Sequence, residues 1–213
     1  MARSYFVTGT DTDVGKSVIT AALAAARHGQ VTAVKPVASG VDGAPGDAER
    51  IAIAAGHPPT VFATWRTPVS PHLAAALEAR PLDLHALLDW LDAIPEPRLI
   101  EGVGGWRVPL ALEPRFEVVD LARHVDLPVL VVAANRLGVL NHTLLTVEAV
   151  RGAGLEVAAV VLNTVGAEDA STAHNLADLR ALAGVPVHPF PHVDPTDPGA
   201  LARAGRELDA LLA

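Results

Sequence analysis

The sequence predicts an α/β fold in which a mainly parallel sheet is flanked by helices in three layers, formed by one domain that spans residues 1–213. Segments with strand and helix patterns alternate along the chain, which is typical of parallel strands joined by right-handed crossovers. Residues 129–134 and 157–162 are continuous apolar runs of strand length, as in a sheet that is covered on both faces. The third observation is a short strand pattern at residues 5–7 that runs through a tight loop into a helix start.

The composition indicates a globular protein and argues against several kinds of partner. Half of the residues are apolar, and the net charge is −8 without a basic run, whereas nucleic-acid binding needs clustered Lys and Arg. The apolar runs are too short to span a bilayer, and the N-terminal residues enter a strand rather than a secretory signal. The lack of cysteine rules out a disulfide, a thiolate metal site and a cysteine nucleophile, and it is consistent with a reducing compartment. We therefore expect a cytoplasmic protein.

The first loop, residues 9–17, has the features of a loop that binds phosphate. Gly15 allows backbone N–H groups to approach phosphate oxygens, Lys16 supplies a point charge, and Ser17 supplies a hydroxyl for Mg²⁺. The apolar helix that follows adds its N-terminal dipole. Five residues, rather than the usual four, separate Gly9 from Gly15, so only the second half of the loop fits the strict pattern. The loop predicts a P-loop NTPase-like fold, with an ordinary strand-to-helix turn as the alternative.

Lysine is rare in this chain: of 16 basic residues, 14 are Arg, and only Lys16 and Lys35 are Lys. Because the two side-chain types differ in hydration, shape and number of donors, we expect that a compact ammonium is required at both places. Lys35 follows a strand pattern at residues 31–34, and the carboxyl ends of parallel strands face the ligand crevice. Lys35 and the nearby Ser39 are therefore site candidates, with a surface lysine and a turn serine as the alternatives.

Two carboxylates follow at positions where a Mg²⁺ ion could be held. Asp47 begins a helix pattern, so it is either an N-cap or a Mg²⁺ ligand, and the sequence leaves both interpretations open. Glu101 ends a strand pattern at residues 98–101 and precedes a glycine-rich loop at residues 102–105. An acid beside a nucleotide site suits Mg²⁺, and the glycines let the backbone approach phosphate or substrate closely. A solvated glutamate before a flexible loop is the alternative.

The remaining segments are expected to form the scaffold. A helix at residues 70–79 begins with Ser70-Pro71-His72, where Pro suits the first turn. His188 and His192 have the spacing of a zinc pair, but the prolines at 189 and 191 break the helix that such a pair needs, so we expect no structural metal. The other predicted elements are helices at residues 16–28, 47–52, 83–94, 116–125, 138–153 and 168–183, strands at 127–135, 156–162 and 185–190, and a C-terminal helix.

Five stretches, spread in order over almost the whole chain, resemble the dethiobiotin synthetase family. They are Gly9–Ser17, Lys35–Gly40, Ser70–His72, Glu101–Trp106 and Gly138–His142. The resemblance implies an ATP-dependent ring closure in biotin biosynthesis, in which 7,8-diaminononanoate and CO₂ (or bicarbonate) give dethiobiotin, ADP and phosphate. One amine captures CO₂ as a carbamate, the γ-phosphate is transferred to a carbamate oxygen, and the second amine attacks the mixed anhydride to close a cyclic urea.

The resemblance also implies roles for individual residues. Lys16 and Lys35 would hold the transferring phosphate and the carbamate, with Lys35 as the active-site lysine, and Ser39 would contact the diamine. The phosphates of ATP would be surrounded by Asp13, Val14, Gly15, Lys16, Ser17, Val18, Glu101, Gly102, Val103 and Gly104. Mg²⁺ would be served by Ser17, Asp47 and Glu101, and adenine would be surrounded by Asn163, Thr164, Pro191, His192 and Val193. The diamine would lie at the interface of a homodimer, near the stretch that matches residues 137–141.

Two other functions are compatible with a phosphate loop. An amidotransferase-like enzyme that activates a carboxylate with ATP usually needs a glutaminase domain with a cysteine nucleophile, and this chain has neither the length nor a cysteine. A nucleotide-switch ATPase of the partitioning type would bind DNA or membrane. Its phosphate loop would carry a lysine at the place of Asp11, and its surface would carry a basic patch or an amphipathic tail. The sequence lacks these features, so it favours the synthetase.

Overall fold

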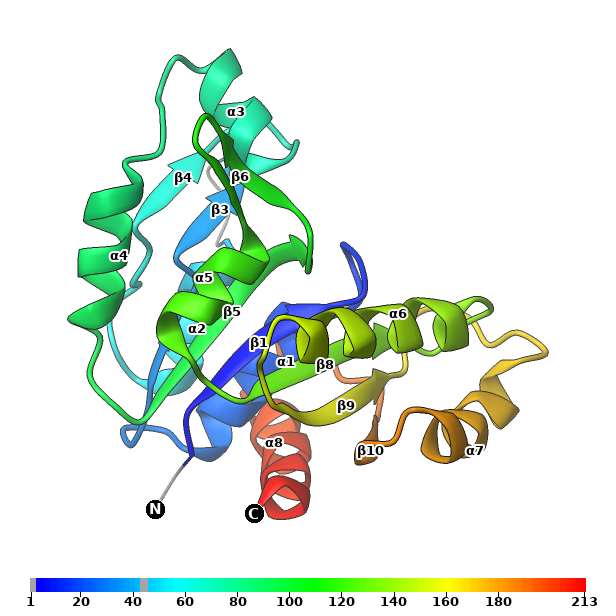
Figure 1. Ribbon diagram of the computed structural model, residues 1–213. Coiled ribbons are helices and arrows are strands. Elements are labelled where there is room, and N and C mark those ends of the chain that lie inside the picture. Colours follow the sequence, from blue (N-terminus) through cyan, green and yellow to red (C-terminus); the bar gives the residue numbers. More distant parts are fainter. Residues whose placement is uncertain (1–2, 43–45) are drawn as a thin grey trace.

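A six-stranded parallel sheet forms the middle layer of the computed structural model, which describes residues 3–42 and 46–213 (Figure 1). Its strands are β1 (Tyr5–Gly9), β2 (Thr32–Val34), β5 (Arg98–Gly105), β8 (Val129–Ala134), β9 (Val157–Asn163) and β10 (Val187–Phe190). The strand order is β10-β9-β8-β1-β5-β2, and all neighbouring pairs are parallel. The chain fills the β5 and β2 side of β1 first and the β8 side later. The switch point, where such folds bind ligands, therefore lies at the carboxyl end of β1.

Helices cover both faces of this sheet. One face carries α1 (Lys16–Ala26), α2 (Asp47–Ala55) and α8 (Pro198–Leu212), and the other carries α4 (Leu84–Asp92), α5 (Val118–Val125), α6 (Val139–Gly152) and α7 (Thr172–Leu182). Side chains of β1 alternate between the two cores: Tyr5 and Val7 pack with α1 and α8, and Phe6 packs on the opposite face. All residues of β8 are buried, as in a central parallel strand. The predicted three-layer α/β fold is confirmed.

Two small sheets, which the sequence did not predict, stand beside the main one. β3 (Val37–Ser39) pairs in parallel with β4 (Ala63–Trp65), and β6 (Pro109–Leu112) forms an antiparallel hairpin with β7 (Arg115–Glu117). Together with α3 (Pro71–Leu77) they form the upper part of Figure 1. The stretch after Lys35 is thus a strand, and residues 116–117 belong to a hairpin rather than to the helix predicted there. Strands this short carry too few residues for a recognisable alternation of apolar and polar positions.

Two site candidates have a different local structure from the one predicted. Glu101 lies inside β5 rather than at its end, because pairing with β1 continues from Glu101, opposite Val7, to Gly105. The glycine-rich stretch is therefore strand and not a flexible loop. Gly46 occupies the N-cap position of α2 and Asp47 is the first helical residue, so the N-cap interpretation of Asp47 is wrong. The Asp47 carboxylate is left for other partners.

The predicted helix ends agree with the structure to within a few residues. Asp83, for example, caps α4 by accepting a hydrogen bond from the Ala86 N–H at 3.0 Å. Over the described residues, every helix falls short of the length and apolarity that a bilayer crossing requires. The expectation that the chain begins without a secretory signal also concerns residues 1–2, which lie outside the described residues.

Candidate active site

The loop between β1 and α1 has a backbone shape that requires glycine at its end. Gly15 has φ +93°, a left-handed conformation, and a Cβ at this position would overlap the side-chain amide of Asn163. That amide donates a hydrogen bond to the Val14 carbonyl at 3.0 Å, which ties the loop to the end of β9. Because α1 begins at the next residue, Lys16, its first backbone N–H groups face the loop, as in sites that bind phosphate.

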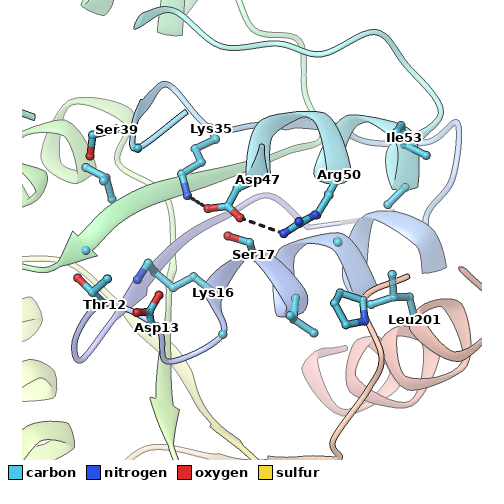
Figure 2. Close-up of a pocket in the computed structure, with 18 of the residues that line it drawn as sticks. Thr12, Asp13, Lys16, Ser17, Lys35, Ser39, Asp47, Arg50, Ile53 and Leu201 are labelled. Atoms are coloured by element: carbon cyan, nitrogen blue, oxygen red, sulfur yellow. Dashed lines mark hydrogen bonds and ion pairs between the residues drawn. The ribbon is translucent and has the colours of Figure 1, made fainter. Parts of the chain in front are cut away.

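A cavity of about 1310 Å³ opens beside this loop (Figure 2). Its wall is formed by the loop and α1, the residues after β2, α2, the end of β5, and the segments before α3 and α8. The predicted site residues that line it are Asp13, Gly15, Lys16, Ser17, Val18, Lys35, Ser39, Asp47, Val103 and Gly104. The only two lysines of the chain, which come from different elements, thus border one cavity.

Lys16, the first residue of α1, is only 6% exposed. Its Nζ donates a hydrogen bond to the Asp11 carbonyl at 2.9 Å, within the phosphate loop itself. Burial lowers the pKa of Lys16, and the attraction of Glu101 opposes this without reversing it. An ammonium that is buried against a neutral carbonyl gains from any anion that enters beside it, so Lys16 is suited to binding phosphate.

Lys35 is also 6% exposed, but its partners are charged. Its Nζ donates to Asp47 Oδ2 at 2.5 Å and to Glu101 Oε1 at 2.8 Å. Burial lowers the pKa of Lys35, but the two carboxylates outweigh burial and hold this pKa above its ordinary value. Burial raises the pKa of Asp47, and Lys35 outweighs it, so the Asp47 pKa lies below its ordinary value. Lys35 is therefore an ammonium, and Asp47 a carboxylate, at neutral pH.

The inner wall offers oxygen atoms that suit a hard cation. Ser17 Oγ donates to Glu101 Oε1 at 2.8 Å, and Glu101 is 1% exposed. Its second oxygen, Oε2, is buried without a hydrogen-bond partner among the described residues, so a cation would satisfy it. No group of three or more His, Cys, Asp or Glu forms a cage within residues 3–42 and 46–213. Mg²⁺ commonly takes one or two carboxylates and completes its shell with phosphates and water, so Ser17, Asp47 and Glu101 fit this ion.

The other predicted site residues lie behind or beside the cavity wall. Val14, Glu101, Gly102 and Asn163 are buried behind it. The residues predicted around adenine are neighbours of lining residues rather than lining residues themselves. The predicted set is Asn163, Thr164, Pro191, His192 and Val193, whereas Val165, Pro195 and Thr196 line the cavity. One cause is local, because the Asn163 side chain is directed to the Val14 carbonyl and not to the cavity.

Sequence reasoning missed the part of the wall that is formed by α2 and by the start of α3. Arg50 lines the cavity one helical turn after Asp47, and Ser70 and Pro71 line it where only scaffold was expected. Two signals were available in the sequence. Residues three apart share a helix face, which places Arg50 beside Asp47. The stretch Ser70-Pro71-His72 was already among those that resemble the family, and His72 Nδ1 lies 3.0 Å from Ser70 Oγ.

Sequence comparisons show which known proteins the chain resembles over most of its length. A family model described as an AAA domain matches residues 3–190. The chain is 37% identical over 220 residues to the ATP-dependent dethiobiotin synthetase BioD of Aromatoleum aromaticum, covering 96% of this chain and 97% of that protein. For the protein of the same name in Anaeromyxobacter dehalogenans (strain 2CP-C), the identity is 41% over 224 residues, covering 99% and 97%. For that of Serratia marcescens it is 42% over 184 residues, covering 78% and 79%.

Two solved structures share the fold at low sequence identity. A ParA family ATPase from Chlorobium tepidum superposes with a TM-score of 0.60 at 11% identity, covering 99% of both chains. The cell division ATPase MinD of Pyrococcus furiosus superposes with a TM-score of 0.54 at 15% identity, covering 99% of this chain and 100% of that one. At these identities the likeness establishes the fold and not the function.

Proposed function

The chain belongs to the ATP-dependent dethiobiotin synthetase family and is an ATP-dependent ligase, and on this premise we propose how it acts. It joins 7,8-diaminononanoate to CO₂ with ATP, giving dethiobiotin, ADP and phosphate through a carbamate and a carbamic-phosphoric anhydride. One observation carries the proposal: Lys16, Lys35 and the oxygens of Ser17 and Asp47 border the same cavity beside the phosphate loop.

Lys16 holds the outer phosphates of ATP in this proposal. The supporting observation is that Lys16 Nζ donates only to the Asp11 carbonyl. In the described part of the chain, this buried ammonium forms no ion pair, whereas Lys35 does. The loop residues Asp13, Val14, Gly15 and Val18, with the β5 residues Gly102, Val103 and Gly104, surround the phosphates. A phosphate oxygen beside Lys16 would replace a neutral acceptor by an anion, which strengthens the hydrogen bond.

Lys35 holds the carbamate and the phosphoryl group as the group passes between oxygens. The transferring phosphoryl group spreads negative charge over its oxygens, so positioned cations lower the barrier. The pairing of Lys35 with Asp47 and Glu101 keeps the ammonium charged and fixes where it stands. A compact ammonium can contact the carbamate and the phosphate in turn, whereas a planar guanidinium is fixed in its fork geometry.

Mg²⁺ is held by Ser17, Asp47 and Glu101 in the same proposal. When bound, the ion supplies positive charge to the oxygens of the outer phosphates. Asp47 is the more exposed of the two carboxylates, so it can leave its ion pair with Lys35 and bind Mg²⁺ instead. Glu101 remains buried. The orphaned Glu101 Oε2 supports a second positive partner at this point.

The diamine occupies the end of the cavity near Ser39. Gly40, next to Ser39, lies against Pro68, and Pro68, Val69 and Pro71 give this part of the cavity an apolar wall that suits an alkyl chain. Ser39 offers a hydroxyl to an amine. The base of the nucleotide occupies the opposite end, near Asn163, Thr164 and residues 191–193, where Val165, Pro195 and Thr196 form the wall. A cytoplasmic location belongs to the proposal, because the reaction consumes ATP.

The proposal includes a homodimer in which the diamine tail reaches the stretch that matches residues 137–141 in the partner subunit. Leu137, two residues before α6, is 80% exposed, and Leu145 on α6 is exposed as well, which supports a contact surface there. Mixing a Lys35→Ala variant with an Asn141→Ala variant tests the shared site. Recovery of activity in the hybrid is expected, and no recovery from two folded, inactive parents would argue against it.

Phosphate release from ATP tests the reaction itself. We expect release only when the diamine and bicarbonate are both present, because the phosphoryl acceptor is the carbamate. Omitting either component should leave a rate close to background. Hydrolysis that ignores the diamine and rises with DNA or lipid vesicles would instead favour the nucleotide-switch ATPase. Asp11 stands where the loop of that class carries a lysine, and the fold likeness alone does not support the switch.

A further inference from the structure

Arg50 is the one arginine among the described residues that line the cavity, although 14 of the 16 basic residues of the chain are Arg. It lies on α2, three residues after Asp47, and its side chain is directed toward Asp47 above Ser17 (Figure 2). The guanidinium is therefore on the side of Asp47 opposite Lys35, close to two residues assigned above to the phosphates and their ion.

The contact between Arg50 and Asp47 is too loose to explain the position of the guanidinium. Arg50 Nη1 lies 3.8 Å from Asp47 Oδ1, and the Arg50 side chain is 51% exposed. Ion pairs of this kind contribute little to stability. Asp47 is already bound more closely, at 2.5 Å, by Lys35. Within residues 3–42 and 46–213, the Arg50 guanidinium donates no hydrogen bond at ordinary distance, so its donors border the cavity without an acceptor.

We propose that Arg50 is a further nucleotide-binding residue, which donates hydrogen bonds to a phosphate of the nucleotide that is retained in ADP. The inference rests on the proposed function only in that ATP occupies this cavity. A guanidinium presents donors in a planar fork that matches phosphate oxygens, which suits a group that holds a phosphate in place. Lys35, on the other side of Asp47, serves the phosphoryl group that leaves.

The position of Arg50 predicts which phosphate it binds. The cavity runs from Ser39, near Lys35, to Ile53 and Leu201 at the far end, and Arg50 lies on the Ile53 side of Asp47 (Figure 2). The diamine end is the Ser39 end, so the phosphate that is transferred lies toward Lys35. The phosphates that remain with the nucleoside lie toward Arg50. ATP and ADP should therefore lose affinity together when Arg50 is replaced.

Arg123 offers a matched control on another helix. Arg123 Nη1 lies 3.7 Å from Asp120 Oδ1 at the same i, i+3 spacing, and its side chain is 52% exposed. It lies on α5, outside the nucleotide cavity, and donates one further bond to the Ala153 carbonyl at 3.3 Å. Arg50→Gln and Arg123→Gln thus remove similar surface ion pairs, and only one of them borders the cavity.

Calorimetric binding of MgATP, MgADP and adenosine to the full chain tests the proposal without any turnover. We expect Arg50→Gln to weaken MgATP and MgADP by about tenfold each, as for a partly exposed charge-assisted hydrogen bond, and to leave adenosine unchanged. Arg50→Lys should recover part of the loss, and Arg123→Gln should change nothing.

Unchanged affinity for both nucleotides in folded Arg50→Gln would overturn the proposal. Loss for MgATP alone would overturn the assignment to a retained phosphate. Diamine-independent hydrolysis would contradict the proposed reaction and leave this result intact.

Discussion

Lys16 and Lys35 are buried to the same extent, yet their surroundings are opposite. Lys16 donates to one neutral carbonyl, and burial lowers its pKa. Lys35 lies between Asp47 and Glu101, whose charges raise its pKa against the effect of burial. The comparison teaches that burial alone does not determine the behaviour of a buried charge, because the partners that are buried with it decide the sign of the pKa shift.

The difference suggests a division of labour. Lys16 is a buried ammonium that has no anionic partner until the nucleotide binds. The phosphate then offsets the cost of removing this charge from water. Lys35 is already satisfied, and it holds two carboxylates that would otherwise repel each other. Both lysines should therefore be needed for activity, while only Lys35 should be needed for the stability of the ligand-free protein.

The largest expected effect is on turnover in Lys35→Arg. We expect kcat to fall about 1,000-fold, because a planar guanidinium does not reproduce a compact donor at the reacting oxygens. The affinity for MgATP should stay within a few-fold of the wild type, since Lys35 serves the acceptor side. Steady-state ADP release and calorimetry measure the two quantities. Full activity in this variant would show that a compact ammonium is not required.

Lys16→Met should have the next largest effect, on the use of ATP. We expect kcat/KM for ATP to fall about 100-fold, as when one preorganised donor to a reacting phosphate is removed. Unlike Lys35→Arg, this variant should also bind MgATP more weakly, which calorimetry reports directly. Unaltered MgATP binding would contradict the assignment of Lys16 to the outer phosphates.

A smaller effect is expected on the stability of Lys35→Met without ligand. Removing the cation leaves Glu101 buried without its partner and close to the carboxylate of Asp47, and breaking the buried Lys35–Glu101 pair costs about 3 kcal/mol of the free energy of unfolding. Denaturant titration at neutral pH measures this loss. The double variant Lys35→Met, Glu101→Gln is the control, and it should recover part of the stability because the repulsion is gone. Equal stability of wild type and Lys35→Met would contradict the comparison.

The smallest effect, of opposite sign, is expected for Lys16→Met. The folded-state pKa of Lys16 is lowered, so between that pKa and 10.5 the unfolded chain binds more protons than the folded chain. The free energy of unfolding of the wild type therefore increases as pH rises over that range. At neutral pH the buried charge of Lys16 destabilises the folded protein, so Lys16→Met should have a free energy of unfolding about 1 kcal/mol higher than the wild type. This difference should shrink as pH approaches 10.5. A less stable Lys16→Met would contradict the expected sign.

Lys35 should show the opposite pH trend. Its pKa is raised, so its contribution to the free energy of unfolding is present below 10.5 and is lost as pH rises above it. Denaturant titrations at neutral and alkaline pH measure both trends.

The phosphate end of the cavity could be predicted from the sequence because its residues stand next to each other or at strand ends. Gly15, Lys16 and Ser17 are consecutive, and the rarity of lysine is enough to single out Lys35. The parallel sheet then brings strand ends to one edge, which is a rule of the fold rather than of the residues. Sequence patterns and this fold rule together were enough to predict the phosphate end of the cavity.

The opposite wall could not be predicted in the same way. Arg50, Ser70 and Pro71 line the cavity because α2 and α3 are placed by tertiary packing, and no local pattern reports where a helix docks. Asp47 shows the same limit, since the sequence left capping and Mg²⁺ binding open, and only the structure shows that Gly46 is the N-cap and that Asp47 pairs with Lys35. Three-residue strands such as β3 and β4 pair with each other at long range, so their residues carry little local signal.

Oxygen-18 in the released phosphate tests the central claim most directly. In a single turnover with labelled CO₂, ATP and the diamine, the carbamate oxygen attacks phosphorus, and the second amine then expels that oxygen with the phosphate. The account predicts one labelled oxygen in each phosphate released by the wild type. Phosphate without label, with its new oxygen taken from water, would contradict phosphoryl transfer to a carbamate and with it the roles given to Lys16 and Lys35.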